Sequence, residues 1–355
     1  MTIKYVESAP NEITYCDNDT LKKISQIAEV FQTPLRGSYT WDYQSHNEKI
    51  RRLYKIGKLL NWNAETDLDW KKTFPKTEFP APLALNPFSE YEEFIIMSHE
   101  EQLRFTWHQT SWTLSQFLHG EQGALLVASQ LISCAPTNDA KLYAGSQTFD
   151  EARHVEAFHR YLTEKIGYIY PVTPPLKMLL DLVLADPRWD LKFIGMQIII
   201  EGLALAAFHT IRDTACDSLL IDLLNYVIRD EARHVAFGVT FLEDFVKALS
   251  DSEKEDRAQF AYSACVIMKN RMVPRRVFEE FRWNKEKAEK VSLESFLMQQ
   301  YRTILFSRII PNLKKIGLLT DKVRPLFDEL GVLQFEHENH DGDINWNVLE
   351  NTPVQ

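Results

Sequence analysis

The hexapeptide Asp-Glu-Ala-Arg-His-Val occurs twice in this chain of 355 residues, at 150–155 and again at 230–235. In each copy a glutamate precedes a histidine by three residues, and residues i and i+3 lie on the same face of a helix. Carboxylate and imidazole groups are both ligands for transition metals. One Glu-x-x-His is a weak indication, because glutamate and histidine are common on surfaces. Its repetition favours one chemical task shared by both copies.

Two further glutamates extend the repeat. Glu121 precedes Glu151 by 30 residues, and Glu201 precedes Glu231 by the same interval. Each unit fits a hairpin of two helices, with a single glutamate on the first helix and Glu-x-x-His on the second. The sequence therefore predicts a cluster of six side chains from four helices, namely Glu121, Glu151, His154, Glu201, Glu231 and His234.

The neighbours of these glutamates predict that they are buried. Ile198 and Leu205 lie on the same helical face as Glu201, and apolar residues also flank Glu121 and Glu231. A buried carboxylate must be neutralised or paired, and nearby lysines are too few to pair four acids. Two divalent cations balance four carboxylates, while neutral imidazoles add no charge. We therefore expect two metal ions, and iron accepts both ligand types.

The residues beside the repeated glutamates predict a supporting layer. Asp150 and Asp230 immediately precede the two glutamates, and Arg153 and Arg233 precede the two histidines. Metal-bound histidines usually donate their other N–H group to a carboxylate. We expect each aspartate to hold the histidine of the opposite repeat, with the arginines neutralising the aspartates. The alternative is a solvated charge pair within each helix.

Helices must position these residues, and the pattern of the chain is helical. Only 12 glycines are present, and no convincing strand pairs occur. The sequence predicts four long helices, over about 89–134 with a bend near 105–107, 138–166, 188–213 and 216–249. Other helices are expected over about 41–60, 175–185, 252–272 and 293–316. The expected organisation is one domain over 1–355, with a metal-binding core of about 90–250, an N-terminal extension 1–88, C-terminal helices 251–335 and a polar tail 336–355.

Charge and composition exclude several classes of function. The net charge of −10 argues against nucleic acid, whose binding needs a basic face. The most apolar stretch, 193–208, is too short for a membrane span and is expected to be a buried helix. The start of the chain lacks the apolar region of a signal peptide. The four cysteines show no Cys-x-x-Cys spacing, so we expect reduced thiols and a cytoplasmic protein.

The two Asp-Glu-Ala-Arg-His copies resemble the Asp-Glu-x-Arg-His signature of the ferritin-like di-iron carboxylate oxidase/oxygenase superfamily, over about residues 90–250. The resemblance implies an all-α fold, with a ferritin-like four-helix bundle core and additional N- and C-terminal helices. It implies two iron ions on the six predicted ligands, or manganese in one position. The implied partners are molecular oxygen, a small organic substrate and an external electron donor, and a homodimer is compatible with it.

The resemblance also implies a reaction class, an oxygen-dependent oxidase or monooxygenase acting on a largely apolar substrate. Hydroxylation, N-oxygenation and oxidative cleavage all stay open. Bacterial hydroxylases and acyl-carrier desaturases have a threonine where this chain has Ala204 and Leu205. Radical subunits of ribonucleotide reductase usually have a tyrosine at the position of Phe158, although members with phenylalanine use manganese and iron. Arylamine N-oxygenases carry an additional histidine ligand at the position of Val227.

An apolar substrate pocket is expected beside the metals. Its candidate residues are Phe117, Leu125, Phe158, Leu205, Phe208 and His209. The three phenylalanines fall on the faces that carry ligands, and His209 is the candidate for a polar substrate contact. Ordinary core packing is the alternative for all six.

Two rival functions remain open on the sequence alone. The first is a ferroxidase or another metal-binding protein, for storage or sensing. The second is a radical-generating subunit similar to that of ribonucleotide reductase. Organic product formed during turnover distinguishes the predicted oxygenase from the first rival, and a catalytic partner chain would favour the second.

Overall fold

The computed structural model describes residues 29, 31–269, 272–342 and 345. Within this part of the chain the regular structure is entirely helical, which confirms the predicted all-α class. The first helices are α2 (Glu48–Leu59), the 3-10 turn η1 (Leu83–Leu85) and α3 (Glu92–Ile95). The expected helix over 41–60 is thus shorter, because the Asn47 side chain accepts from the Ile50 amide and caps α2 there.

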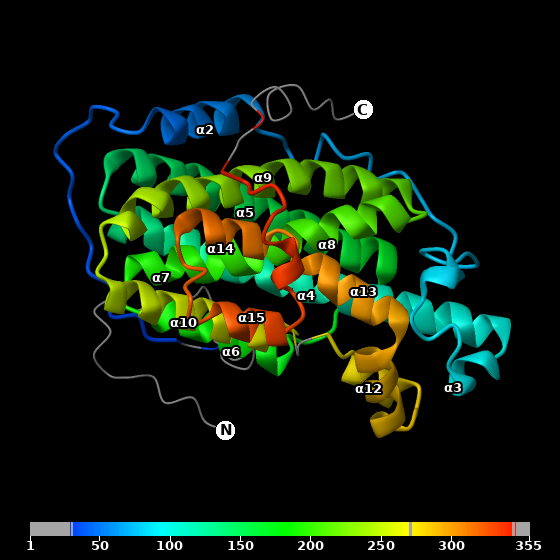
Figure 1. Ribbon diagram of the computed structural model, residues 1–355. Coiled ribbons are helices and arrows are strands. Elements are labelled where there is room, and N and C mark those ends of the chain that lie inside the picture. Colours follow the sequence, from blue (N-terminus) through cyan, green and yellow to red (C-terminus); the bar gives the residue numbers. More distant parts are fainter. Residues whose placement is uncertain (1–28, 30, 270–271, 343–344, 346–355) are drawn as a thin grey trace, which may run out of the picture.

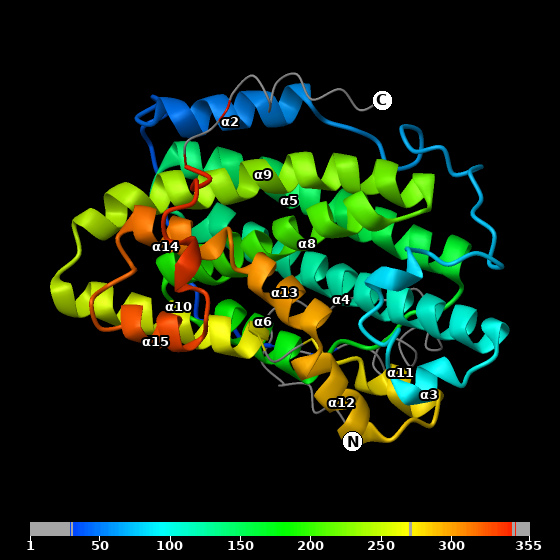
Figure 2. The ribbon, with the colours of Figure 1, turned by 45° about the vertical axis from the view of Figure 1, so that its right-hand side comes forward.

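Four long helices form the core of the molecule (Figures 1 and 2). They are α4 (His99–Cys134), α5 (Asn138–Arg160), the continuous helix made of α7 (Trp189–Phe193), η3 (Ile194–Ile200) and α8 (Glu201–Thr214), and α9 (Ser218–Lys247). α4 packs along α5, α8 packs along α9, and α5 contacts α9. Two helical hairpins therefore face each other, as the repeat in the sequence requires.

The start of α4 differs from the prediction. The helix begins at His99 and runs without interruption through 105–107, where the sequence suggests a bend. Ser98 and Glu101 form a reciprocal capping box, since the Ser98 hydroxyl accepts from the Glu101 amide and the Glu101 carboxylate accepts from the Ser98 amide. This cap outweighs the weaker start signal at residue 89, and only the short helix α3 lies before it.

The helix that carries Glu201 is irregular in its middle. Ile194–Ile200 adopts a π-helical conformation, and Glu201 follows it directly. A second π-helical segment, η2 (Tyr161–Ile166), continues α5. By length and composition, Trp189–Thr214 is the one described helix that qualifies as a membrane span, but its most apolar window is entirely buried within the protein. It is the central helix of the core, which agrees with the predicted buried helix.

The remaining helices cover the bundle on three sides. α2 lies across α5 and α9, and α6 (Pro174–Ala185) and α10 (Asp251–Lys269) pack against each other on another side (Figures 1 and 2). The region predicted as one helix over 293–316 is divided among α12 (Lys285–Glu294), α13 (Phe296–Leu305) and α14 (Ile309–Ile316). The chain continues through α15 (Arg324–Glu329) and η4 (Leu333–Phe335).

A separate aromatic cluster attaches α11 (Arg275–Glu280) and α12 to the start of α4. Phe105 stacks on Trp283 with ring centroids 4.2 Å apart, and Phe88 and Phe278 pack around them. α13 continues from α12 and contacts α8. The cluster therefore holds the C-terminal helices over one end of the core. The expected polar tail falls mostly on residues outside those described.

Candidate metal centre

The structure brings the six predicted ligands together inside the bundle. Each comes from a core helix: Glu121 from α4, Glu151 and His154 from α5, Glu201 from the first position of α8, and Glu231 and His234 from α9. All six are buried, with at most 5% of any residue exposed. Candidate ligand atoms form two groups, each within 4.8 Å, namely Glu121 with Glu151, His154 and Glu231, and Glu151 with Glu201 and His234.

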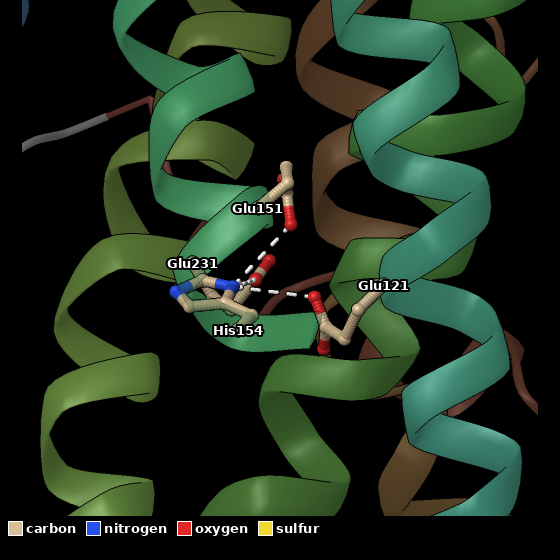
Figure 3. Close-up of side chains that lie close together, drawn as sticks. All are labelled: Glu121, Glu151, His154 and Glu231. Atoms are coloured by element: carbon tan, nitrogen blue, oxygen red, sulfur yellow. Dashed lines mark hydrogen bonds and ion pairs between the residues drawn. The ribbon is translucent and has the colours of Figure 1, made fainter. Parts of the chain in front are cut away.

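The first group surrounds one nitrogen of His154 (Figure 3). His154 Nδ1 lies 3.2 Å from Glu121 Oε2, 3.3 Å from Glu151 Oε2 and 3.2 Å from Glu231 Oε1. Three carboxylates from three helices thus converge on the same side of this imidazole. One metal ion among them would have the oxygen and nitrogen donors that iron and manganese accept.

The second histidine shares two of these carboxylates. His234 Nδ1 lies 3.1 Å from Glu151 Oε1 and 3.6 Å from Glu231 Oε2. Glu151 and Glu231 therefore direct one oxygen toward each histidine, whereas Glu121 belongs to the His154 side and Glu201 to the His234 side. Glu121 and His154 would hold one ion and Glu201 and His234 a second, while Glu151 and Glu231 face both positions.

Several buried atoms of this cluster lack a hydrogen bond, which indicates a binding site for cations. Glu151 Oε2, both carboxylate oxygens of Glu231 and His234 Nδ1 are buried and make the close contacts given above without a hydrogen bond of good geometry. Glu201 Oε2 is buried without a hydrogen-bond partner among the described residues. Buried polar atoms normally have partners, because losing water without replacement is costly. Five such atoms at one point fit metal coordination, so the donor set suits two transition-metal ions.

Burial and neighbouring charges shift the pKa values of three of these acids in different directions. Burial and the neighbouring Glu231 raise the pKa of Glu121 and of Glu201 well above the ordinary value. Burial also raises the pKa of Glu151, but His234 and His154 outweigh it and hold this pKa below the ordinary value. Two divalent cations would relieve the repulsion and displace the protons, because ligand carboxylates bind metal in the deprotonated form.

The predicted supporting residues lie directly behind the histidines. His154 Nε2 is 3.2 Å from Asp230 Oδ2, and His234 Nε2 is 3.2 Å from Asp150 Oδ2. Each aspartate thus faces the histidine of the other repeat. With its Nε2 toward an aspartate, each imidazole turns Nδ1 toward the glutamates, which is the orientation that metal binding requires.

Two buried arginines cross between the same aspartates. Arg233 donates to Asp230 Oδ1 at 2.7 Å and to Asp150 Oδ2 at 3.1 Å. Arg153 donates to Asp150 and, at 3.2 Å, to Asp230 Oδ2. The four residues form one ionic network that ties α5 to α9. Their two positive charges balance the two aspartates, so the network adds no net charge to the site.

Two residues that the sequence analysis does not single out also contact the cluster and its supporting residues. The indole N–H of Trp62 donates to Asp230 Oδ2 at 2.7 Å. The Gln147 amide donates to Glu151 Oε1 at 3.1 Å and to Glu201 Oε1 at 2.8 Å. Gln147 lies one turn before Glu151 on the same helical face, so its spacing is a usable signal. Trp62 lies in a connector without periodicity, where no local pattern points to it.

A small cavity of about 20 Å³ opens beside the carboxylates of Glu121, Glu201 and Glu231. Its other wall is made of small and apolar residues, among them Gly120, Ala124 and Ala204. A larger cavity of about 410 Å³ lies between α4, α8 and α13. Two residues line both spaces, namely Gln116 and Phe117. The metal cluster is therefore adjacent to a space that can hold an organic molecule.

Of the six predicted pocket residues, Phe117 lines these two cavities. Phe158 and Phe208 lie behind it, with ring centroids of Phe117 and Phe208 4.7 Å apart and those of Phe158 and Phe208 5.7 Å apart. Leu125, Leu205 and His209 do not line either cavity; Ala204, next to Leu205, does. Burial, together with Arg212, lowers the pKa of His209 to about 4.

Comparisons with known proteins give one matching family and structures with a similar fold. The family model described as P-aminobenzoate N-oxygenase AurF matches residues 43–317. An R2-like ligand-binding oxidase, solved with an aerobically reconstituted metal cofactor after photoconversion, is 15% identical at a TM-score of 0.50, covering 85% of this chain and 99% of its own. The dimanganese(II)-NrdF of Streptococcus sanguinis is 13% identical at a TM-score of 0.49, covering 79% and 92%. No curated protein matches.

Proposed function

The chain belongs to the P-aminobenzoate N-oxygenase AurF family, and on this premise we propose that it is a di-iron, oxygen-dependent oxidoreductase of a small, largely apolar organic substrate. The membership confirms the ferritin-like di-iron superfamily that the sequence repeat predicts, and it supports an oxygenase or oxidase in general. The R2-like oxidase adds support for the fold. The cytoplasmic location and the homodimer stay predictions.

One observation carries the proposal, namely a buried four-carboxylate, two-histidine cluster that opens onto a cavity. We assign Glu121 and His154 to one ion, Glu201 and His234 to the other, and Glu151 and Glu231 to both. Two iron ions bound there supply the redox chemistry that reduces dioxygen. Manganese in one position is compatible with the same donors.

The surrounding residues determine how the site works. Asp150 and Asp230 orient the histidines, while Gly120, Ala124 and Ala204 leave room beside the carboxylates. Phe117, together with the phenylalanines behind it, limits the access of water to that space. In a monooxygenase reaction one oxygen atom enters the product and the other leaves as water. Two electrons and two protons must then come from an external donor.

The reaction type is the finer part of the proposal. N-oxygenation of an amine is the first reaction to test, because the family description names it. Val227 departs from the arylamine N-oxygenase pattern, since it is apolar and buried where those enzymes carry an additional histidine. Hydroxylation and oxidative cleavage are the alternatives. Ala204 and Leu205 leave no hydroxyl at the position of the hydroxylase threonine.

The experiment compares oxygen consumed with product formed in iron-loaded protein given a chemical reductant and a panel of apolar amines and hydrocarbons. We expect oxygenated product in the wild type and none in Glu151→Ala. A matched control is Glu156→Ala, on the same helix but away from the cluster, which should behave as wild type. Iron oxidation without organic product for any member of the panel would instead favour the ferroxidase.

A further inference from the structure

We propose that the cavity between α4, α8 and α13 selects an uncharged, mostly apolar substrate, with room for two aromatic ring systems, and that it rejects aromatic acids. The inference rests on the proposed function, because it treats this cavity as the substrate site of the metal centre. Its volume of about 410 Å³ is within the range of about 300–1,000 Å³ that is usual for small-molecule sites.

The cavity is separated from the space beside the metal cluster by two residues that line both. Gln116 and Phe117 line both the large cavity and the small space beside Glu121 and Glu201. Phe117 lies one helical turn before Glu121, so a molecule in the large cavity reaches the carboxylates by passing this ring. The end of the substrate nearest to Phe117 is therefore the end that reacts.

The lining of the large cavity carries no charge. Among the described residues that line it there is no aspartate, glutamate, lysine, arginine or histidine. The walls are instead formed by apolar and aromatic side chains such as Trp112, Ile211 and Leu297. An anion inside would lose water without gaining a cation from the lining. Burial of an unpaired carboxylate under these conditions is strongly unfavourable.

Most polar residues of the lining already use their hydrogen-bond donors within the protein. The hydroxyl groups of Thr113, Thr210 and Thr214 donate to carbonyls four residues earlier in their own helices, at 3.1, 3.0 and 2.8 Å. Ser292 does the same at 3.1 Å. The Gln116 amide donates to the Pro171 carbonyl at 3.0 Å. These five residues therefore offer an anion few free hydrogen-bond donors. Their oxygen atoms can still accept a hydrogen bond from an amine or hydroxyl group.

This lining does not suit p-aminobenzoate, the substrate that the description of the family names. A p-aminobenzoate ion carries a carboxylate, which needs a cation or several donors in a buried site. The described residues of the cavity supply no cation, and five of its polar residues already use their donors within the protein. We infer that the substrate of this chain has an apolar or amide-like group where p-aminobenzoate has its carboxylate.

Two fluorescent probes of one scaffold test the inference. N-phenyl-1-naphthylamine is neutral, and 8-anilino-1-naphthalenesulfonate adds a sulfonate to the same rings. Dissociation constants are measured with metal-free protein, so that the result does not depend on oxygen chemistry. We expect the neutral probe to bind at least about tenfold more tightly than the anion, because the anion has no partner. Equal binding, or tighter binding of the anion, would overturn the inference.

Four variants test where the probes bind and why the anionic probe is rejected. Ala207→Phe fills the cavity and should abolish binding of the neutral probe; unchanged binding would show that the probe lies elsewhere and would also overturn the inference. Thr210→Lys places a cation on the cavity wall and should restore binding of the anionic probe. The uncharged Thr210→Met should not restore it. Gln300→Lys, at an exposed position of the lining, repeats the charge test where folding is least at risk. Failure of these tests would not contradict the proposed metal centre or the proposed oxygen uptake, which are tested separately.

Discussion

At the scale of single residues, Asp230 is the most connected side chain behind the candidate metal ligands. It contacts His154 at 3.2 Å, accepts from Trp62 at 2.7 Å and accepts from both Arg153 and Arg233. Burial raises the pKa of this carboxyl, but Arg233 and His154 outweigh burial and keep the pKa well below its ordinary value. The aspartate is therefore ionised, and it can hold the His154 ring with Nδ1 toward the glutamates.

The first prediction concerns this aspartate. Asp230→Asn keeps the shape of the side chain but removes the charge that orients His154. We expect the affinity for one of the two ions to fall by about 10–100-fold, as is usual when such a partner is lost. The other ion, beside His234 and Asp150, should be affected less. Titration of metal-free protein with ferrous iron or manganese measures both steps.

A buried aspartate away from the cluster provides the control. Asp190 is equally buried and accepts from Arg257 at 2.8 Å, on the side of the bundle that faces α10. Asp190→Asn should lower the stability of the protein and leave both metal affinities unchanged. If Asp230→Asn also left them unchanged, Asp230 would be a structural residue and not a support for the metal site.

Spacing is sufficient to predict which six side chains come together, because it encodes two helical hairpins with the same register. Their role as ligands stays a prediction until metal is measured. The contacts of Trp62 and Gln147 illustrate two limits. Trp62 reaches Asp230 from 168 positions away in the chain, which only tertiary structure reveals. Gln147 shares the face of Glu151, but an amide in a core is not by itself a signal of metal support.

At the scale of elements, the approach of α9 to η3 determines where Glu201 lies. A Cβ atom at Gly238 would come 2.5 Å from the Cβ atom of Gln197, so only glycine permits this spacing. Gln197 in turn donates to Gln147 at 3.4 Å. The contact therefore lies at the π-helical segment that immediately precedes Glu201, and it connects two ligand helices.

The second prediction tests this contact. Gly238→Ala should force α9 and η3 apart and lower the free energy of unfolding by about 1–3 kcal/mol. It should also weaken metal binding, because Glu201 shifts with η3. Gly145→Ala is the matched control, since nothing lies within 4 Å of its added Cβ atom. In the middle of α5 this change should instead stabilise the protein by about 0.5–1 kcal/mol. Denaturant unfolding and metal titration distinguish the two variants, and equal behaviour would contradict the prediction.

The positions of the long helices are largely predictable from the sequence, whereas their details are not. The predicted helix over 216–249 agrees closely with α9. The start of α4 differs because the capping box at Ser98 lies beyond the start signal at residue 89. The π-helical segments have no signature in an apolar run such as 194–200. They depend on the packing of neighbouring helices, which periodicity does not describe.

At the scale of the whole molecule, metal binding and pH are coupled. Glu121 and Glu201 have raised pKa values in the fold, mainly through burial. An unfolded chain loses these protons near pH 4.3, so the folded protein loses stability as the pH rises above that value. His154 and His234 also have raised pKa values, because their carboxylate neighbours outweigh burial. Their contribution is present below about pH 6.5 and is lost as the pH rises through the folded pKa.

The third prediction follows for metal-free protein. Its melting temperature should fall between pH 6 and pH 8, while that of the metal-loaded protein changes less, because the ions replace the protons. The difference between the melting temperatures of the metal-loaded and the metal-free protein should widen by about 2 °C or more per pH unit for each proton that the fold retains. Scanning calorimetry with and without a chelator measures it. The Glu121→Gln variant should reduce this pH dependence, since it removes one of the titrating acids. A difference in melting temperature that stays constant with pH in the wild type would argue against repulsion among these acids.

The large cavity is the feature of the whole molecule that the sequence predicts least. Its lining comes from η1, α4, α8 and α13, which are distant in the sequence, and α13 reaches the site only because an aromatic cluster anchors α11 and α12. Phe117 is predictable because it lies one turn before Glu121. Ala204 lines the site in place of Leu205, because the rotation of α8 after the π-helical segment cannot be derived from periodicity.

The most direct test of the metal centre is anomalous X-ray scattering from crystals of the iron-loaded protein, measured on both sides of the iron edge. We expect two peaks per chain, about 3.5–4 Å apart. One should lie beside Glu121 and His154 and the other beside Glu201 and His234, with Glu151 and Glu231 between them. A single peak, or peaks away from these side chains in fully loaded protein, would contradict the assignment.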